Sequence, residues 1–471
     1  MSWTVLLGKP SLCLNLNNVP KGNPMSINTL LAGKALGFGT APLGNMFRDI
    51  PEAEAQATVD AAWEQGTRYF DTAPFYGAGL AEIRLGDALA KRNRDDFVLS
   101  TKVGRLILDE VEDVSARDLG EKGEVFKYGR PNRIVNDYSE DATYRSIEDS
   151  LKRLKTDHID IAWVHDIAQD FYGDEWLTMF ESARRGAFRA LDRMRDEGVI
   201  KAWGLGVNRV EPIELLLALD EPRPDGFLLA GRYTLLDHDR ALQRVMPMVV
   251  ERGLGIVVGG PYSSGALVGG PNFEYAPATP AILDKVARIK ALADQHGISM
   301  KAAGLQFALA NPAVAAVIPG ASQPKRIAED RAALNEVVPA EFWRALRAAG
   351  LVNPRRCPSR TDPRGRPDTR PRPGRAPVGA HPAPLPGAHQ QEGIDHDRSE
   401  QGCGSPWASR HAARSRRGDP RRCRRCPLCS AGPGAEQRRI IARGVQPGID
   451  RRPPPGRAAF RADGPEYGAG L

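Results

Sequence analysis

The sequence predicts an α/β fold, a (β/α)8 TIM barrel, followed by an Arg/Pro/Gly-rich tail that is disordered by its composition. Between Gly33 and about Gly350, short β-branched runs alternate eight times with stretches whose apolar residues recur at helical spacing. The competing fold is an open doubly wound sheet. No G-x-G-x-x-G motif follows the first strand, and this favours the barrel.

The repeated alternation defines the individual elements. The expected strands are, in chain order, Ala35–Gly39, Arg68–Asp71, Phe97–Thr101, Ile159–His165, Ala202–Val207, Gly226–Leu229, Gly255–Val258 and Ala315–Ile318. The clearest expected helices are Ala53–Gln65, Leu80–Lys91, Ala142–Leu154, Phe188–Glu197, Arg240–Arg252 and Pro280–His296. In the first helix, Ala55, Val59 and Ala62 lie on one face, and Gly66 ends the helix.

Two longer insertions interrupt this rhythm, at Ile107–Tyr138 after the third strand and Ala168–Arg185 after the fourth. Both follow the carboxyl ends of strands, where barrel active sites are built. Their aromatic residues either line a binding pocket or pack the loops down, and the sequence leaves both possibilities open for Tyr128, Tyr138, Phe171, Tyr172 and Trp176.

Composition divides the chain into three regions. Residues 1–32 are an extension expected to be poorly ordered in part, with Met25 as an alternative start, and residues 33–354 form the barrel. Residues 355–471 contain no lysine or methionine and hold 24 arginines against 11 acidic residues, which indicates an unstructured extension or a frameshift product. The net charge of +7 therefore comes from the tail and does not indicate nucleic-acid binding.

Cysteine usage and hydropathy indicate a cytoplasmic protein. Cys13 alone precedes the tail, so the barrel needs no disulfide, which fits a reducing compartment. No apolar run approaches the roughly 18–20 residues that span a bilayer, and no signal-peptide core is present. In the tail, Cys423, Cys426 and Cys429 resemble part of an iron–sulfur ligand set but lack a fourth cysteine, so no metal site is predicted.

Four residues at successive strand ends predict a proton-transfer site: Asp71 and Tyr76 in FDTAPFYG, Lys102 in STKVG and His165 in WVHD. A free phenol has a pKa of about 10, and a nearby cation favours the phenolate and lowers that value. Lys102 would be that cation, with Asp71 as its counter-charge, and His165 would orient a carbonyl oxygen. The alternative is a surface tyrosine, a structural ion pair and a satisfied histidine.

The sequence resembles the aldo/keto reductase family from Gly33 to Gly350. The resemblance rests on the ordered blocks GFGTAPLGN, FDTAPFYG, LGDAL, STKVG, VHD, GLGVN and IPGASQPKRIAED. It implies a barrel that binds NAD(P)(H) without a Rossmann fold. It also implies that Tyr76 is the general acid/base, that Asp71 and Lys102 tune it, and that His165 orients the substrate.

The resemblance also implies the residues that contact the dinucleotide. They are Gly39, Thr40, Ala41, Asp71, Asn208, Pro261, Tyr262, Ser263, Gly265, Leu267, Gly320, Ser322, Arg326, Glu329 and Asp330. The glycine-rich segment 261–270 would lie along the pyrophosphate, unless it is an ordinary turn. Two departures lie at the nicotinamide end, where Ala230 replaces a glutamine and Gly259 replaces a stacking aromatic residue.

A third departure indicates the preferred dinucleotide. NADPH-preferring relatives carry a lysine and a hydroxyl residue after an Ile-Pro pair, and here Gly320 and Ala321 stand in their place. Arg326 remains as the only predicted contact to a 2′-phosphate. Each charge-assisted hydrogen bond is worth roughly 1.5–3 kcal/mol. We therefore expect NAD to be preferred, with NADP possible.

Two segments, Leu228–Asp237 and Gly259–Gly270, resemble the branch that contains D-threo-aldose 1-dehydrogenases (L-fucose dehydrogenases) and pyridoxal 4-dehydrogenases. The expected function is oxidation of the anomeric hydroxyl of L-fucose, L-galactose or D-arabinose to the lactone. The alternatives are pyridoxal oxidation, a non-catalytic nucleotide-sensing subunit and a Schiff-base aldolase using Lys102. The expected partner is a small molecule, without nucleic acid or membrane, and the oligomeric state stays open.

Overall fold

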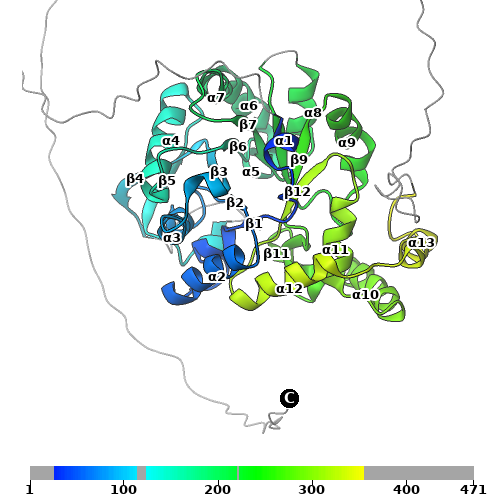
Figure 1. Cartoon of the computed structure of the whole chain (residues 1–471). Coiled ribbons are helices and arrows are strands. Elements are labelled where there is room, and N and C mark those ends of the chain that lie inside the picture. The colour runs from blue at the N-terminus through cyan, green and yellow to red at the C-terminus, as the bar shows by residue number, and fades with distance from the viewer. Residues whose placement is uncertain (1–25, 114–122, 220–221, 355–471) are drawn as a thin grey trace, which may run out of the picture. The chain divides into compact units, whose positions relative to one another are not determined.

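The computed structural model describes residues 26–113, 123–219 and 222–354, and these form the barrel drawn in Figure 1. Two parallel bridges, Leu36 with Val317 and Gly39 with Gly320, join the first strand to the last. The eight parallel strands follow the order β1 (Phe38–Gly39), β2 (Tyr69–Asp71), β3 (Val98–Val103), β6 (Ile161–His165), β7 (Ala202–Val207), β8 (Gly226–Ala230), β9 (Gly255–Gly259) and β12 (Val314–Ile318). The predicted fold class is confirmed.

The predicted strands and most predicted helices are confirmed to within a few residues. The helices are α2 (Glu52–Glu64), α3 (Leu80–Leu89), α4 (Glu140–Leu154), α7 (Ala187–Asp196) and α10 (Pro280–Gln295). The single helix expected over Arg240–Arg252 is instead a π turn at Ala241–Val245 followed by α9 (Met246–Glu251). Pro247 has no N–H to donate, and the Met246 N–H reaches back to the carbonyl of Ala241, which widens the turn.

Further helices are present that the sequence analysis did not name individually. They are α6 (Trp176–Arg185), α8 (Glu211–Ala218), α11 (Met300–Leu309), α12 (Pro324–Asn335) and α13 (Ala340–Ala348). The sequence of helix α11 shows why this helix could not be predicted from hydrophobic periodicity. Its sequence MKAAGLQFAL is apolar on most sides, and most of its residues are buried, so no polar face alternates with an apolar one.

Described structure begins at Ser26, before the predicted barrel boundary at residue 33. Ser26 caps the short helix α1 (Ile27–Leu30), and Ile27 is fully buried. Asn28 donates a hydrogen bond to the carbonyl of Leu254 at 2.9 Å, just before β9. This helix therefore packs against the amino ends of the strands. Residues 1–25 and 355–471, with the cysteines of the tail, lie outside the described residues.

Both predicted insertions carry their own secondary structure beside the carboxyl ends of the strands. The first contains an antiparallel hairpin of β4 (Arg105–Val111) and β5 (Asn132–Asn136). The second contains α5 (Gln169–Tyr172), a 3-10 turn (Gly173–Glu175) and α6. A further hairpin follows β9 and pairs β10 (Asn272–Phe273) with β11 (Ala276–Pro277). Within the described residues, no helix is long and apolar enough to cross a membrane.

Candidate active site

Asp71 and Lys102 form a buried ion pair at the carboxyl ends of β2 and β3. The Lys102 Nζ atom lies 2.7 Å from Asp71 Oδ2 and donates to the carbonyl of Thr72 at 2.8 Å. The Ser100 hydroxyl donates to Asp71 Oδ1 at 2.6 Å. Both charged side chains are almost fully buried, so each needs these partners to remain charged. Asp71 thus lies where the sequence predicted a counter-charge for Lys102.

Tyr76 lies above this ion pair, in the turn that follows β2. Its ring centroid is 4.8 Å from Lys102 Nζ and 6.0 Å from the centroid of His165. The turn depends on Gly77, whose φ is 64° and whose missing Cβ would lie 2.3 Å from the carbonyl oxygen of Gly44. A side chain at this position would therefore displace the turn, and Tyr76 with it.

The structure corrects the expected direction of the Tyr76 pKa. Burial is the largest influence and raises the pKa of Tyr76 well above its ordinary value, and the carboxylates of Asp71 and Asp166 act in the same direction. Arg105 is the cation that opposes them. The field of Lys102 is largely cancelled at the phenol because Asp71 is 2.7 Å from its ammonium group.

His165 is the last residue of β6 and faces the same cavity. Burial, followed by the charges of Arg105 and Lys102, lowers the pKa of His165 well below its ordinary value, so the imidazole is neutral at neutral pH. Its Nε2 atom lies 3.3 Å from Asp166 Oδ2, and its carbonyl accepts a hydrogen bond from the Tyr138 hydroxyl at 2.7 Å. The structure thus brings all four predicted catalytic residues together.

A cavity of about 530 Å³ opens at Tyr76, Lys102 and His165, and Asp71 is buried beneath it. The aromatic side chains that line it are those of Phe75, Tyr76, Phe126, Phe171 and Tyr275. Of the five aromatic residues singled out in the insertions, one, Phe171, lines the cavity. Tyr138 and Tyr172 hydrogen-bond each other at 2.8 Å, Trp176 packs against the core, and Tyr128 is exposed.

Phe126 and Tyr275 reach the cavity from two different hairpin regions. Phe126 stacks on Tyr76 with ring centroids 5.7 Å apart. Tyr275 is presented by the two-residue turn between β10 and β11, in which Glu274 has φ 50° and Tyr275 has φ 68°. Neither residue type favours this backbone region, so tertiary contacts must hold the turn. Sequence reasoning missed both residues, because no local pattern reports contacts made by loops.

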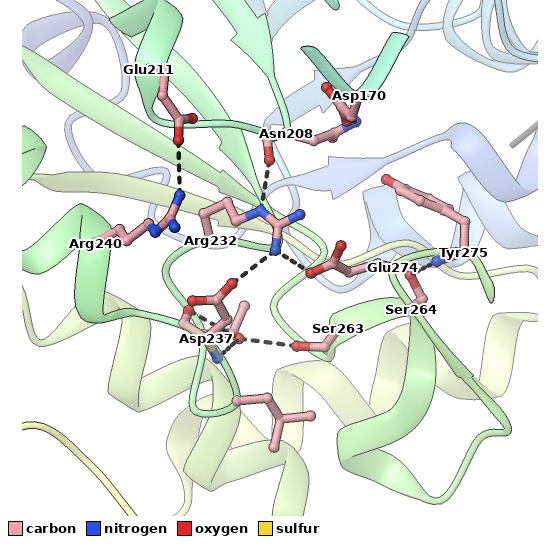
Figure 2. A network of polar contacts seen from close by, with 12 residues as sticks. Asp170, Asn208, Glu211, Arg232, Asp237, Arg240, Ser263, Ser264, Glu274 and Tyr275 are labelled. Atoms are coloured by element: carbon pink, nitrogen blue, oxygen red, sulfur yellow. Dashed lines mark hydrogen bonds and ion pairs between the residues drawn. The ribbon is translucent and has the colours of Figure 1, made fainter. Parts of the chain in front are cut away.

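Arg232, just after β8, holds this turn in place (Figure 2). Its guanidinium binds Asp237 at 2.8 Å and also Glu274, and its Nε donates to the carbonyl of Asn208 at 2.7 Å. The Asn208 side chain donates to Asp170 at 3.3 Å. One arginine therefore ties the hairpin to Asn208, one of the predicted dinucleotide contacts.

A second cavity of about 350 Å³ adjoins the first, and Asn208 and Ala230 line both. Gly231, Gly260, Ser263 and Ser264 form much of its wall, so backbone groups are accessible there. Ala230 pairs with Gly259 across β8 and β9, and a Cβ atom on Gly259 would lie 3.1 Å from that of Ala230. These small residues leave space beside Asn208.

Most of the other predicted dinucleotide contacts lie on three segments. Gly39, Thr40 and Ala41 lie at the end of β1, where Thr40 donates to the carbonyl of Asp71 at 2.9 Å. Pro261, Gly265 and Leu267 continue the loop after β9, and Leu267 is buried. Gly320 bridges to Gly39, and Ser322 and Arg326 follow β12.

Three further predicted contacts, Tyr262, Glu329 and Asp330, belong to one polar cluster that includes Lys301. The Tyr262 hydroxyl donates to Asp330 at 2.8 Å, and Lys301 lies 2.7 Å from Asp330 and 3.0 Å from Glu329. Sequence reasoning missed two residues at this end, Arg48 and Glu54. Arg48 donates to the carbonyl of Ser322 at 3.0 Å and pairs with Glu54 at 3.0 Å, before and within α2. Within the described part of the chain, no group of three or more His, Cys, Asp or Glu residues is placed to hold a metal ion.

The chain belongs to the aldo/keto reductase family, because the model of that family matches residues 35–350. It is therefore an enzyme, an oxidoreductase of a family whose members use nicotinamide dinucleotides as cofactors and act on small molecules. The buried Asp71–Lys102 pair beneath Tyr76, with His165 opposite, lies within the matched region.

Relatives and solved structures agree with this assignment. The chain is 37% identical over 333 residues to pyridoxal 4-dehydrogenase of Microbacterium luteolum, covering 69% of this chain and 96% of that protein. It is 36% identical over 328 residues to D-threo-aldose 1-dehydrogenase of a Pseudomonas species, covering 68% and 95%. The structure of aldo-keto reductase AKR11C1 from Bacillus halodurans matches with a TM-score of 0.50 and 26% identity, covering 68% and 92%.

Proposed function

We propose that this protein is an NAD-dependent dehydrogenase that oxidises the anomeric hydroxyl of an aldose to the lactone. The observation that carries the proposal is the single cavity in which Tyr76, Lys102 and His165 meet, with Asp71 buried beneath. The 36% identity to a D-threo-aldose 1-dehydrogenase, over 95% of that protein, supports an aldose as the substrate. The adjoining glycine- and serine-walled cavity at Asn208 suits the dinucleotide.

The residues of the chain divide the chemistry between them. The Tyr76 phenolate accepts the proton of the anomeric hydroxyl as the C1–H bond breaks and the C1=O bond forms. When bound, the oxidised nicotinamide accepts the hydride from C1. Neutral His165 donates a hydrogen bond to the reacting oxygen and positions it against Tyr76. Because burial raises the pKa of Tyr76, the phenolate fraction and the oxidation rate rise toward alkaline pH.

The test is a substrate panel of L-fucose, L-galactose, D-arabinose and pyridoxal, followed by NADH absorbance at several pH values. We expect at least one aldose to have the highest kcat/KM, with activity rising on the alkaline side. A clear preference for pyridoxal would replace the proposal with the second candidate, which the 37% identity to pyridoxal 4-dehydrogenase supports. A Schiff-base aldolase would need a neutral amine at Lys102, which instead lies against the Asp71 carboxylate.

We expect a higher kcat/KM with NAD+ than with NADP+. Glu54 lies beside Arg48 and Arg326, and the hydrogen bond from Arg48 holds the pKa of that carboxyl below its usual value. An ionised carboxylate accepts a hydrogen bond from a ribose hydroxyl and repels a 2′-phosphate. Steady-state kinetics with both dinucleotides checks the ranking. In the Glu54→Gln variant, the ratio of kcat/KM with NAD+ to kcat/KM with NADP+ should fall by about tenfold. This is the effect expected from the loss of one charge-assisted hydrogen bond. A wild-type preference for NADP+ would contradict this expectation.

A further inference from the structure

A second buried ion pair adjoins the active site and has no part in the chemistry described so far. Arg105 is the first residue of β4, and Asp166 directly follows His165. The guanidinium Nη2 of Arg105 lies 2.9 Å from Asp166 Oδ2, and the same carboxylate oxygen is 3.3 Å from His165 Nε2. Both charged side chains are about 95% buried. Guanidinium, carboxylate and imidazole thus form a continuous line into the cavity.

The backbone on both sides of this pair is constrained. Gly104 has φ 100°, and a Cβ there would lie 2.2 Å from the ring of Tyr138, so glycine alone lets the chain turn toward Arg105. Asp166 has φ 53°, a left-handed conformation that Asp and Asn tolerate better than other side chains. Strained backbone conformations cluster at functional sites.

Aromatic rings fix the orientation of the guanidinium. The Arg105 Cζ atom lies 3.9 Å from the ring centroid of Phe75 and 4.7 Å from that of Phe171. Both rings line the cavity, as Asp166 does. The pair therefore stays in place without substrate, and it faces the reacting groups rather than the outer helices.

We propose that Arg105 and Asp166 are a positioning pair that keeps the proton of neutral His165 on Nε2 and balances the charge around Tyr76. His165 Nδ1 is buried without a hydrogen-bond partner, so the nearby Asp166 carboxylate is the group that favours a proton on Nε2. The inference rests on the proposed role of Tyr76 in proton transfer, but not on the identity of the substrate.

The charges around Tyr76 form two neutral pairs. Strands β2 and β3 contribute Asp71 and Lys102, β6 and the residue after it contribute His165 and Asp166, β4 contributes Arg105, and the β10–β11 turn contributes Tyr275. Asp170 of α5 acts on Tyr275. Removing one member of the Arg105–Asp166 pair leaves the other charge uncompensated in a dry site, where its field is strong.

The two single substitutions therefore act in opposite directions. Asp166 raises the pKa of Tyr76 and Arg105 lowers it. In Asp166→Asn, which suits the left-handed backbone, Tyr76 should titrate about one pH unit lower. In Arg105→Gln it should titrate about one unit higher. The double variant Arg105→Gln/Asp166→Asn removes both charges, and Tyr76 should titrate there at a pH between those of the two single variants. Arg105→Lys keeps the positive charge, so Tyr76 should titrate there near its wild-type pH.

The titration of Tyr76 in each variant is measured from phenolate absorbance as the pH is raised, without substrate or cofactor. Subtracting the curve of each variant's Tyr76→Phe counterpart isolates Tyr76 from the other tyrosines. The alkaline limb of kcat/KM for sugar oxidation should move in the same direction as the titration. Shifts of opposite sign support the inference even where no aldose is turned over, which separates it from the proposed function. No shift, or shifts of the same sign, in variants whose circular dichroism and Tm show a folded protein would overturn it.

Discussion

Replacing Tyr76 by phenylalanine is expected to lower kcat for sugar oxidation by about 10²–10⁴-fold, the usual value of a general acid/base. The substitution removes one oxygen and leaves the ring, which stacks on Phe126 at 5.7 Å, in its place. Dinucleotide affinity should change little, because the cavity proposed for the phosphates is lined by other residues. Saturation kinetics gives kcat, and quenching of tryptophan fluorescence gives the dissociation constant of NADH.

A matched control separates chemistry from packing. Tyr144→Phe, on the outer helix α4, removes the same hydroxyl from a tyrosine that packs against the core but is absent from the cavity lining. Its kcat should stay within about twofold of the wild type, as expected for a substitution that touches no reacting group. Near-normal turnover in Tyr76→Phe would show that the reacting proton goes to another group.

Replacing Lys102 by methionine should reduce both activity and stability. The Asp71 carboxylate, 1% exposed, would lose its cation and keep the Ser100 hydroxyl as a partner. Breaking a buried ion pair by removing one member costs about 3–5 kcal/mol. The free energy of unfolding, from denaturant titration, should fall by that amount. Turnover should fall as well, since Tyr76 would face an uncompensated negative charge that opposes phenolate formation.

The double variant Lys102→Met/Asp71→Asn tests whether the unpaired Asp71 carboxylate causes the loss of stability and turnover. Removing both charges should recover most of the lost stability, because no charge is then left buried without a partner. It should also recover part of the lost turnover, because Tyr76 then no longer faces an uncompensated negative charge. Equal destabilisation in the single and double variants would mean that the loss comes from packing and not from the unpaired carboxylate.

The barrel strands were predictable because each is a short buried run bounded by glycine or polar residues. The range Ala202–Val207 is the same in prediction and structure. Helices were predictable where one face is polar, as in α4, and failed where burial removed that contrast, as in α11. Helix α1 was missed because a single turn of helix carries too few residues to show a period, and its stability comes from contacts with strands far along the chain.

The four predicted catalytic residues could be placed because parallel strands in a barrel bring their carboxyl ends to one rim. The positions of the strand ends are therefore enough to predict that these four residues lie close together. The residues that complete the site come from the hairpins and loops around it: Arg105, Phe126, Arg232 and Tyr275. Arg105 meets Asp166 across 61 positions in sequence, and no local pattern reports a contact of that span.

By itself, the sequence determined the barrel, the family resemblance and the candidates for the proton-transfer residues. Each depends on local pattern or on short blocks in a set order. Only the tertiary structure decided the electrostatic state of Tyr76. That state depends on how completely the phenol is buried and on whether each nearby charge has a partner. The burial of the phenol and the pairing of the nearby charges depend on all the groups that surround Tyr76. Those groups come from segments that are far apart in the sequence.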